Sequence, residues 1–161
     1  MAQYQATIDW QASGGFREGR YSRAHRWEFD GGASVAASSS PGVVPLPYSD
    51  PAGVDPEEAL VASAASCHML WFLSLAQKAG FDVASYRDEA VGTIGRDERG
   101  RISVTRIELR PAIAFSGREP SAAELAELHH AAHESCFIAN SLRTEIVVAG
   151  SEEPRSAAAG A

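Results

Sequence analysis

The sequence predicts an α+β protein, in which antiparallel strands pair in hairpins and two helices stand apart from them. Two observations carry this prediction. A period-two alternation typical of strands occurs near the N-terminus and again over residues 83–115. Two long helical segments each begin with a capping box, at residues 55–58 and 121–124.

The composition is that of an ordinary globular domain. With 161 residues, 45% of them hydrophobic, the chain can bury one core, and we predict a single domain over residues 1–150 followed by a flexible tail, 151–161. Two cysteines do not make a disulfide scaffold. The net charge of -7 argues against nucleic acid or an acidic membrane as a partner. The N-terminus has no signal-peptide pattern, so we expect a cytoplasmic protein.

The N-terminal third reads as strands followed by a long loop. Residues 3–10 and 20–30 are predicted strands, and "DGG" at 30–32 is a hairpin turn that leads into a short returning strand. Residues 41–54 hold four of the eight prolines, a density that no regular element tolerates. This segment is either an ordered extended loop or a mobile lid, and its apolar residues suggest that it packs against something.

The next segment carries the clearest helix signals. Asp55 is a candidate N-cap, Pro56 occupies the first helical position, and Glu58 completes a capping box. We predict a helix that runs to about Ala79 and ends at Gly80. It is apolar on nearly every face, which predicts a long central helix that is covered all round.

This helix also raises a question about membranes. Residues 59–76 are 18 positions without Asp, Glu, Lys or Arg, close to the lower limit for a membrane span. Three serines, a histidine and many alanines interrupt the run. We therefore expect a helix buried in a protein core or a dimer interface, with no membrane partner.

The second half predicts a long antiparallel hairpin and a second helix. Residues 83–96 and 101–115 are the two arms, and Ile107 and Leu109 should face a core. Ser121 and Glu124 then open the second helix. One face of that helix carries Leu125, Leu128, Ala132 and Cys136. "SLRTEIVVA" is the last predicted strand.

The two cysteines are Cys67, in the middle of the first helix, and Cys136, at the end of the second. A buried thiol is often inert and simply fills space. To act as a nucleophile it must ionise, and because burial raises the pKa of a thiol, a reactive one needs a cation nearby. Four early arginines are candidates: Arg17, Arg20, Arg23 and Arg26.

Two motifs resemble the OsmC/Ohr family of osmotically inducible and organic hydroperoxide resistance proteins. "DPEEALVASAASC" is similar to that family's helix start and peroxidatic cysteine, and "HESCFIANS" to its second-cysteine segment. The order of elements is also similar over residues 4–149. The resemblance implies an OsmC-like intertwined homodimer with no cofactor.

The resemblance also implies a function and its residues. Cys67 matches the peroxidatic position and Cys136 the resolving position of a thiol-dependent peroxidase that reduces organic hydroperoxides and is recycled by a lipoyl-type dithiol. Glu57 matches the acidic residue that holds the catalytic arginine. For that arginine we favour Arg23, because it lies on a predicted strand, and place Arg20 second.

The dimer also follows from helix geometry. Glu57 and Cys67 are ten residues apart on one helix, which is about 15 Å along its axis. They cannot meet at one site on a straight helix. If both serve one active site, Glu57 comes from a partner subunit.

The histidines allow several readings. His129, His133 and Cys136 share one helix face, which, together with His68, makes a zinc site conceivable. The chain has no CxxC or HExxH motif, so we expect no metal. His68 or His133 could instead tune a thiol, and we expect His129 and His130 on the surface.

Two functions remain open from the sequence. The first is the peroxidase, with an apolar entrance formed by Met69, Leu70, Trp71, Phe72, Val43, Leu46 and Tyr48. The second is a non-catalytic relative that binds a small apolar ligand in the dimer groove. Substitution of Cys67 distinguishes them.

Overall fold

The structure is a computed structural model that describes residues 1–150. It consists of two compact units, one over Met1–Ala59 and one from Leu60 onward. The predicted tail at 151–161 lies outside the described residues, and the single domain over 1–150 stays a prediction. The predicted α+β class is confirmed: most strands pair antiparallel, and the helices form separate elements.

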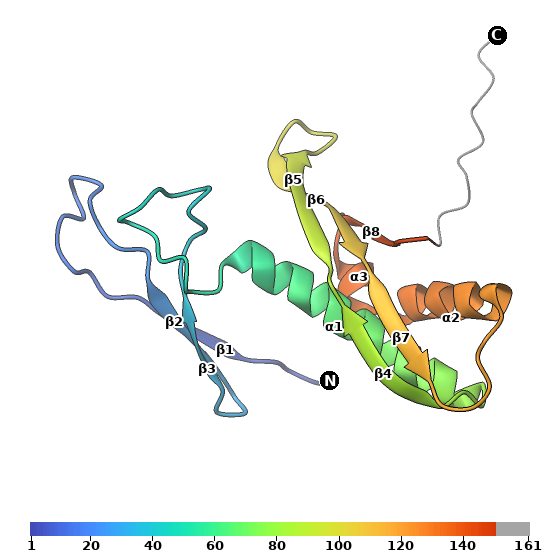
Figure 1. Cartoon of the computed structure of the whole chain (residues 1–161). Helices are drawn as coiled ribbons and strands as arrows, with labels where there is room; N and C mark the ends of the chain where they lie inside the picture. The colour runs from blue at the N-terminus through green and yellow to red at the C-terminus, as the bar shows by residue number, and fades with distance from the viewer. Residues whose placement is uncertain (151–161) are drawn as a thin grey trace, which may run out of the picture. The chain divides into compact units, whose positions relative to one another are not determined.

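The N-terminal unit contains a small antiparallel sheet, drawn in blue in Figure 1. Its strands, in the order β1-β2-β3, are β1 Ala6–Asp9, β2 His25–Phe29 and β3 Ser34–Ala37. The predicted hairpin turn is confirmed, and Gly32 adopts the positive φ of 85° that a tight turn needs. The strand predicted over 20–30 begins only at His25, so the expectation that Arg23 lies on a strand is wrong.

The end of the proline-rich loop, residues 41–54, is hydrogen-bonded to β3 and to the residue that follows it. The backbone N–H of Val54 donates to the Ala36 carbonyl, and that of Ser38 donates to the Val54 carbonyl. Gly53 lies so close to Ala37 and Ser38 that a Cβ there would clash. The apolar residues of the loop are less covered than expected, since Val43 and Leu46 are about three-fifths exposed, at 60% and 62%.

The long helix α1, Pro56–Lys78, has both of its predicted ends. The Asp55 carboxylate accepts the Glu58 N–H at 2.8 Å, and the Glu58 carboxylate accepts the Asp55 N–H at 3.2 Å. At the other end the Gly80 N–H donates to Gln77 and the Phe81 N–H donates to Ala76. This is a Schellman motif, for which Gly80 supplies the positive φ of 79°.

Only one face of α1 is buried within the chain, where we expected a helix covered on all sides. The buried residues recur every four positions: Ala64, His68, Phe72 and Ala76. Leu70, on another face, is 61% exposed. By length and composition α1 could cross a membrane, with a mean hydropathy of 1.6 over 18 residues, but a single such helix is weak evidence because core helices pass the same test.

The second unit is built around a long hairpin whose arms are each interrupted once (Figure 1). Its elements are β4 Val83–Asp88, β5 Val91–Arg96, β6 Ile102–Leu109, β7 Pro111–Phe115, α2 Ala122–Ser135, α3 Phe137–Ser141 and β8 Glu145–Val148. β4 pairs with β7 and β5 with β6, both antiparallel, as predicted. β8 joins the other edge of β6 in parallel.

The second unit has two apolar clusters, and α1 contributes to both. One contains Phe72, Ala76, Phe81, Leu128 and Ala132. The other contains Ala64, Ile107, Leu109 and Val148. Ile107 and Leu109 are fully buried, which confirms the predicted inward register of β6. α1 therefore packs on α2 through one cluster and on the strands through the other.

Candidate active site

The two cysteines, far apart in the sequence, are neighbours in the second unit. Cys67 is partly buried on α1, and Cys136 is 1% exposed. Both are free thiols, and they are close enough that Cys67 raises the pKa of the Cys136 thiol. The structure therefore brings together the two residues singled out as peroxidatic and resolving, although their roles stay predictions.

Cys136 occupies the junction of two helices. It is the C-cap of α2 and the N-cap of α3, a short helix that the sequence analysis did not foresee. Its sulfur accepts the backbone N–H of Ala139 at 3.4 Å. Burial raises the pKa of the Cys136 thiol, and the neighbouring Cys67 side chain raises this pKa further. Cys136 is thus held protonated in the reduced protein.

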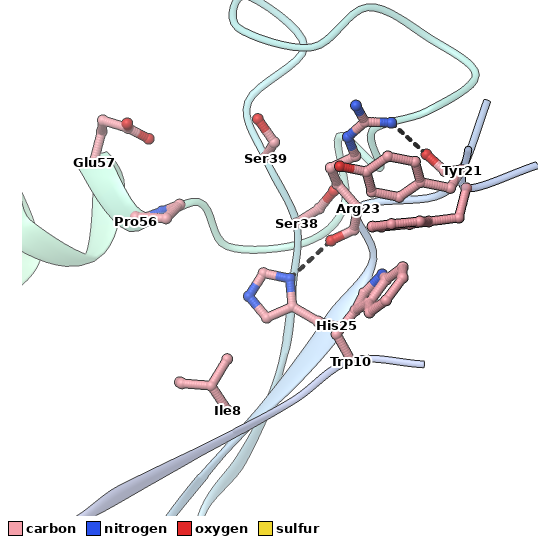
Figure 2. A pocket seen from close by; sticks show the side chains of 10 residues that line it. Ile8, Trp10, Tyr21, Arg23, His25, Ser38, Ser39, Pro56 and Glu57 are labelled. Atoms are coloured by element: carbon pink, nitrogen blue, oxygen red, sulfur yellow. Dashed lines mark hydrogen bonds between the residues drawn. The ribbon is translucent and has the colours of Figure 1, made fainter. Parts of the chain in front are cut away.

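Arg23 and Glu57 line one pocket in the N-terminal unit, shown in Figure 2. Its volume is about 420 Å³. The other lining residues are Ile8, Trp10, Phe16, Tyr21, His25, Ser38, Ser39 and Pro56. Of the four candidate arginines, only Arg23 lines this pocket. The pocket thus distinguishes Arg23 from Arg17, Arg20 and Arg26, which do not line it.

Arg23 is held by local contacts, although it precedes the strand. Its Nη1 donates to the Tyr21 carbonyl at 2.6 Å, and its guanidinium lies 3.7 Å from the centre of the Tyr21 ring. Its own carbonyl is 2.8 Å from His25 Nδ1. In Figure 2 the guanidinium is turned toward Tyr21, and Glu57 lies at the start of α1. The hydrogen bond to the Tyr21 carbonyl and the contact with the Tyr21 ring together hold the guanidinium at the pocket.

The other arginines have different surroundings. Arg20 closes a turn through its backbone, donating to the Gly15 carbonyl at 2.9 Å, and its side chain is exposed. Arg26 is exposed and donates to the Ser34 hydroxyl at 3.0 Å. Neither has the ring contact that fixes Arg23.

The aromatic side of the pocket was not predicted. Trp10, Phe16 and Tyr21 form a cluster with ring centroids 4.8 to 5.7 Å apart. Trp10 Nε1 also donates to the Ser22 carbonyl at 2.8 Å. No signal in the sequence pointed to Trp10 or Phe16.

The expected apolar entrance is partly wrong. Phe72, one of its proposed members, is fully buried in the core of the second unit. Trp71 is engaged by Phe137 of α3, with ring centroids 5.6 Å apart. The large side chains at 71 and 72 therefore have structural contacts inside the unit.

The expectation for His129 is wrong, because this histidine is buried, at 6% exposed, while His130 is exposed as expected. His129 lies next to the apolar face of α2, so the His129 ring points toward α1. There His129 Nδ1 lies 3.0 Å from Nε2 of His68, which is 1% exposed. Across residues 1–150 no three His, Cys, Asp or Glu side chains are grouped to hold a metal ion.

The histidine pair predicts acid sensitivity. Burial lowers the pKa of His68 to about 4, with further lowering by His129 and His133, and burial lowers the pKa of His129 to about 4. Unfolded histidines titrate near 6.5. The unfolded state therefore binds more protons as pH falls from 6.5 to 4, and folding loses on the order of a few kcal/mol across that window.

Urea denaturation at pH 7, 6, 5 and 4.5 measures this loss. The variant His68→Phe/His129→Phe should lose less stability than the wild type over the same range, since carboxylates titrate alike in both. His130→Gln, which changes an exposed histidine, should follow the wild type. Equal losses in the wild type and the double variant would contradict the prediction.

The comparisons with known proteins agree on one family. The family model described as OsmC-like protein matches residues 49–150, well over half of the chain. An OsmC-like protein of unknown function from Vibrio cholerae is 52% identical in sequence, with a TM-score of 0.89, and the match covers 92% of this chain and 98% of that one. No curated protein matches the chain.

More distant structures show the same fold. An organic hydroperoxide resistance protein from Elizabethkingia anophelis has 19% identity and a TM-score of 0.65 over 92% of this chain and 96% of that one. The organic hydroperoxide resistance protein OhrB of Bacillus subtilis has 17% identity and a TM-score of 0.61 over 91% and 95%. The family match, the Vibrio relative and this shared fold together show that the chain belongs to the OsmC/Ohr family.

Proposed function

We propose that this protein is a thiol-dependent peroxidase that reduces organic hydroperoxides to alcohols in the cytoplasm as part of an oxidative stress response. The observation that carries the proposal is the pair of neighbouring free thiols, Cys67 and Cys136. Membership of a family that includes proteins named for organic hydroperoxide resistance supports it.

The chemistry uses the two sulfurs in sequence. The Cys67 thiolate attacks one oxygen of the hydroperoxide, the O–O bond breaks, and the alkoxide takes a proton and leaves as an alcohol. Cys67 is then a sulfenic acid, oxidised by two electrons. The Cys136 sulfur attacks Cys67, water leaves, and a disulfide forms. An external dithiol of the lipoyl type restores both thiols by exchange.

The cation in this scheme is Arg23, acting together with Glu57 on Cys67 of the partner subunit in a homodimer. Two facts support this assignment. Arg23 and Glu57 line the same pocket, and Glu57 is ten residues from Cys67 on one continuous helix. Arg20 stays the second choice. A guanidinium next to the sulfur favours the thiolate and gives two aligned donors to the peroxide oxygens.

The pocket also supports an organic rather than inorganic peroxide. Its wall of Trp10, Phe16 and Tyr21 can bury an apolar substituent, and its volume of about 420 Å³ lies in the usual range for small-molecule sites. Hydrogen peroxide would gain nothing from such a wall.

Mass spectrometry of the reduced protein after one equivalent of cumene hydroperoxide tests the proposal. We expect the loss of two hydrogens, a Cys67–Cys136 linked peptide and one equivalent of cumyl alcohol. The disulfide should form faster than it does with hydrogen peroxide. If the peroxide persists and both thiols stay reduced, the protein is instead a non-catalytic relative whose pocket binds an apolar ligand.

A further inference from the structure

The contact between His68 and His129 is an end-to-end hydrogen bond. The two rings are nearly coplanar, with 12° between their planes and centroids 5.3 Å apart, while Nε2 and Nδ1 are 3.0 Å apart. The centroid separation exceeds the nitrogen separation by about the radii of two imidazole rings, so the rings meet edge to edge in one plane. An N–H of one ring therefore points directly at the lone pair of the other.

This bond lies in an apolar environment. His68 is 1% and His129 is 6% exposed. The Phe72 ring lies against His129 at 4.6 Å between centroids, with 30° between their planes. The other nitrogen of His68, Nδ1, is buried with no partner within the described chain. A directional polar contact therefore connects α1 to α2 in surroundings where water does not compete with it.

The same two helices carry the two cysteines. His68 directly follows Cys67 on α1, and His129 precedes Cys136 by seven residues, which is about two turns of α2. Apolar contacts alone let two helices slide or rotate slightly at low cost. A hydrogen bond of 3.0 Å with one donor and one acceptor permits a single offset between the helices.

We infer that His68 and His129 are positioning residues, whose hydrogen bond sets the offset of α1 on α2 and thereby holds the Cys67 and Cys136 sulfurs in place to form a disulfide. The catalytic use of that disulfide rests on the proposed function. The positioning role does not rest on the proposed function, because it can be measured with any oxidant that converts the two thiols to a disulfide.

The experiment is a redox equilibrium that needs no peroxide. Protein is equilibrated with reduced and oxidised glutathione, quenched with acid and labelled with a maleimide, which measures the effective concentration of one thiol toward the other. In the exchange, two protein thiols and one glutathione disulfide give one protein disulfide and two glutathione thiols. His129→Phe removes the bond but keeps a ring, and we expect the effective concentration to fall about tenfold or more.

Two further variants separate positioning from general stability. In His129→Asn the amide places a polar atom near the Nδ1 position, so the effective concentration should recover to within a few-fold of the wild type, even if the smaller side chain lowers stability. His130→Asn, which changes the exposed neighbour of His129 on the same helix, should leave the effective concentration unchanged. Should His129→Phe not fold, His129→Leu and His129→Gln lose the same bond with a smaller or displaced group.

The outcomes are distinct for the two proposals. A wild-type effective concentration in the folded variants that lack the bond overturns the inference, whether or not peroxide is consumed. A folded Asn variant no better than the Phe variant also overturns it. If the wild type forms the disulfide with glutathione but never consumes hydroperoxide, the proposed function fails and the positioning role stands.

Discussion

Replacing Cys67 with serine should abolish the consumption of cumene hydroperoxide or tert-butyl hydroperoxide when a dithiol is supplied. A serine hydroxyl is not ionised near neutral pH and cannot accept an oxygen atom to form a sulfenic acid. We expect turnover to fall by at least about a thousandfold, to the background of the dithiol alone. The measurement is steady-state peroxide consumption by the wild type and the variant at equal concentration.

Cys136→Ser is the matched variant, because it removes the neighbouring thiol and leaves Cys67 intact. It should consume about one equivalent of peroxide and then stall, because no neighbouring thiol remains to convert the Cys67 sulfenic acid into the disulfide that the dithiol reduces. Its Cys67 sulfenic acid should react with dimedone and be seen by mass spectrometry. Equal slow turnover by the wild type and Cys67→Ser would reject the peroxidase and favour a ligand-binding protein.

Replacing Arg23 with alanine should slow the reaction of reduced protein with hydroperoxide by about a hundredfold to a thousandfold. The reason is that a positioned donor aimed at developing charge is worth this much in other enzymes. Arg23 is the candidate with a fixed guanidinium, through Tyr21. The measurement is the second-order rate constant for peroxide in single turnover, before the dithiol step.

Arg20→Ala and Arg26→Ala serve as controls, since both side chains are exposed. Each should react within a few-fold of the wild type. A larger loss in Arg20→Ala than in Arg23→Ala would transfer the role to Arg20. Comparable losses in all three variants would show that general positive charge, rather than one placed guanidinium, assists the thiol.

Mixed dimers test whether two subunits share the proposed site. Arg23→Ala subunits should be slow and Cys67→Ser subunits inactive, but if the arginine of one subunit serves the cysteine of the other, a mixed dimer keeps one complete site. Co-expression of the two variants should then recover up to about half of the wild-type activity per mixed dimer. No recovery in a verified mixed dimer would mean that each subunit carries a self-contained site.

Local signals in the sequence were enough to predict most of the elements. The capping boxes at Asp55 and Ser121 form as predicted, because their partners are only three residues away and depend on nothing distant. The inward register of Ile107 and Leu109 follows equally from the two-residue period of a strand.

What failed were inferences about what a residue meets across the fold. His129 was placed on the surface and is buried, because its burial depends on α1 packing against that side of α2. The helix α3 was missed because its N-cap is Cys136, and cysteine is not among the residues that usually signal a helix start. Arg23 was preferred for lying on a strand, yet its ring contact with Tyr21 distinguishes it.

The sequence by itself determined the family motifs, the two cysteines and the ends of both long helices, because motifs and caps are properties of short segments. Only the tertiary structure decided that Cys67 meets Cys136, that His68 meets His129, and that Arg23 shares a pocket with Glu57. Each of these pairs is separated by more than thirty residues, and contacts at that range arise from packing of whole elements rather than from local preference.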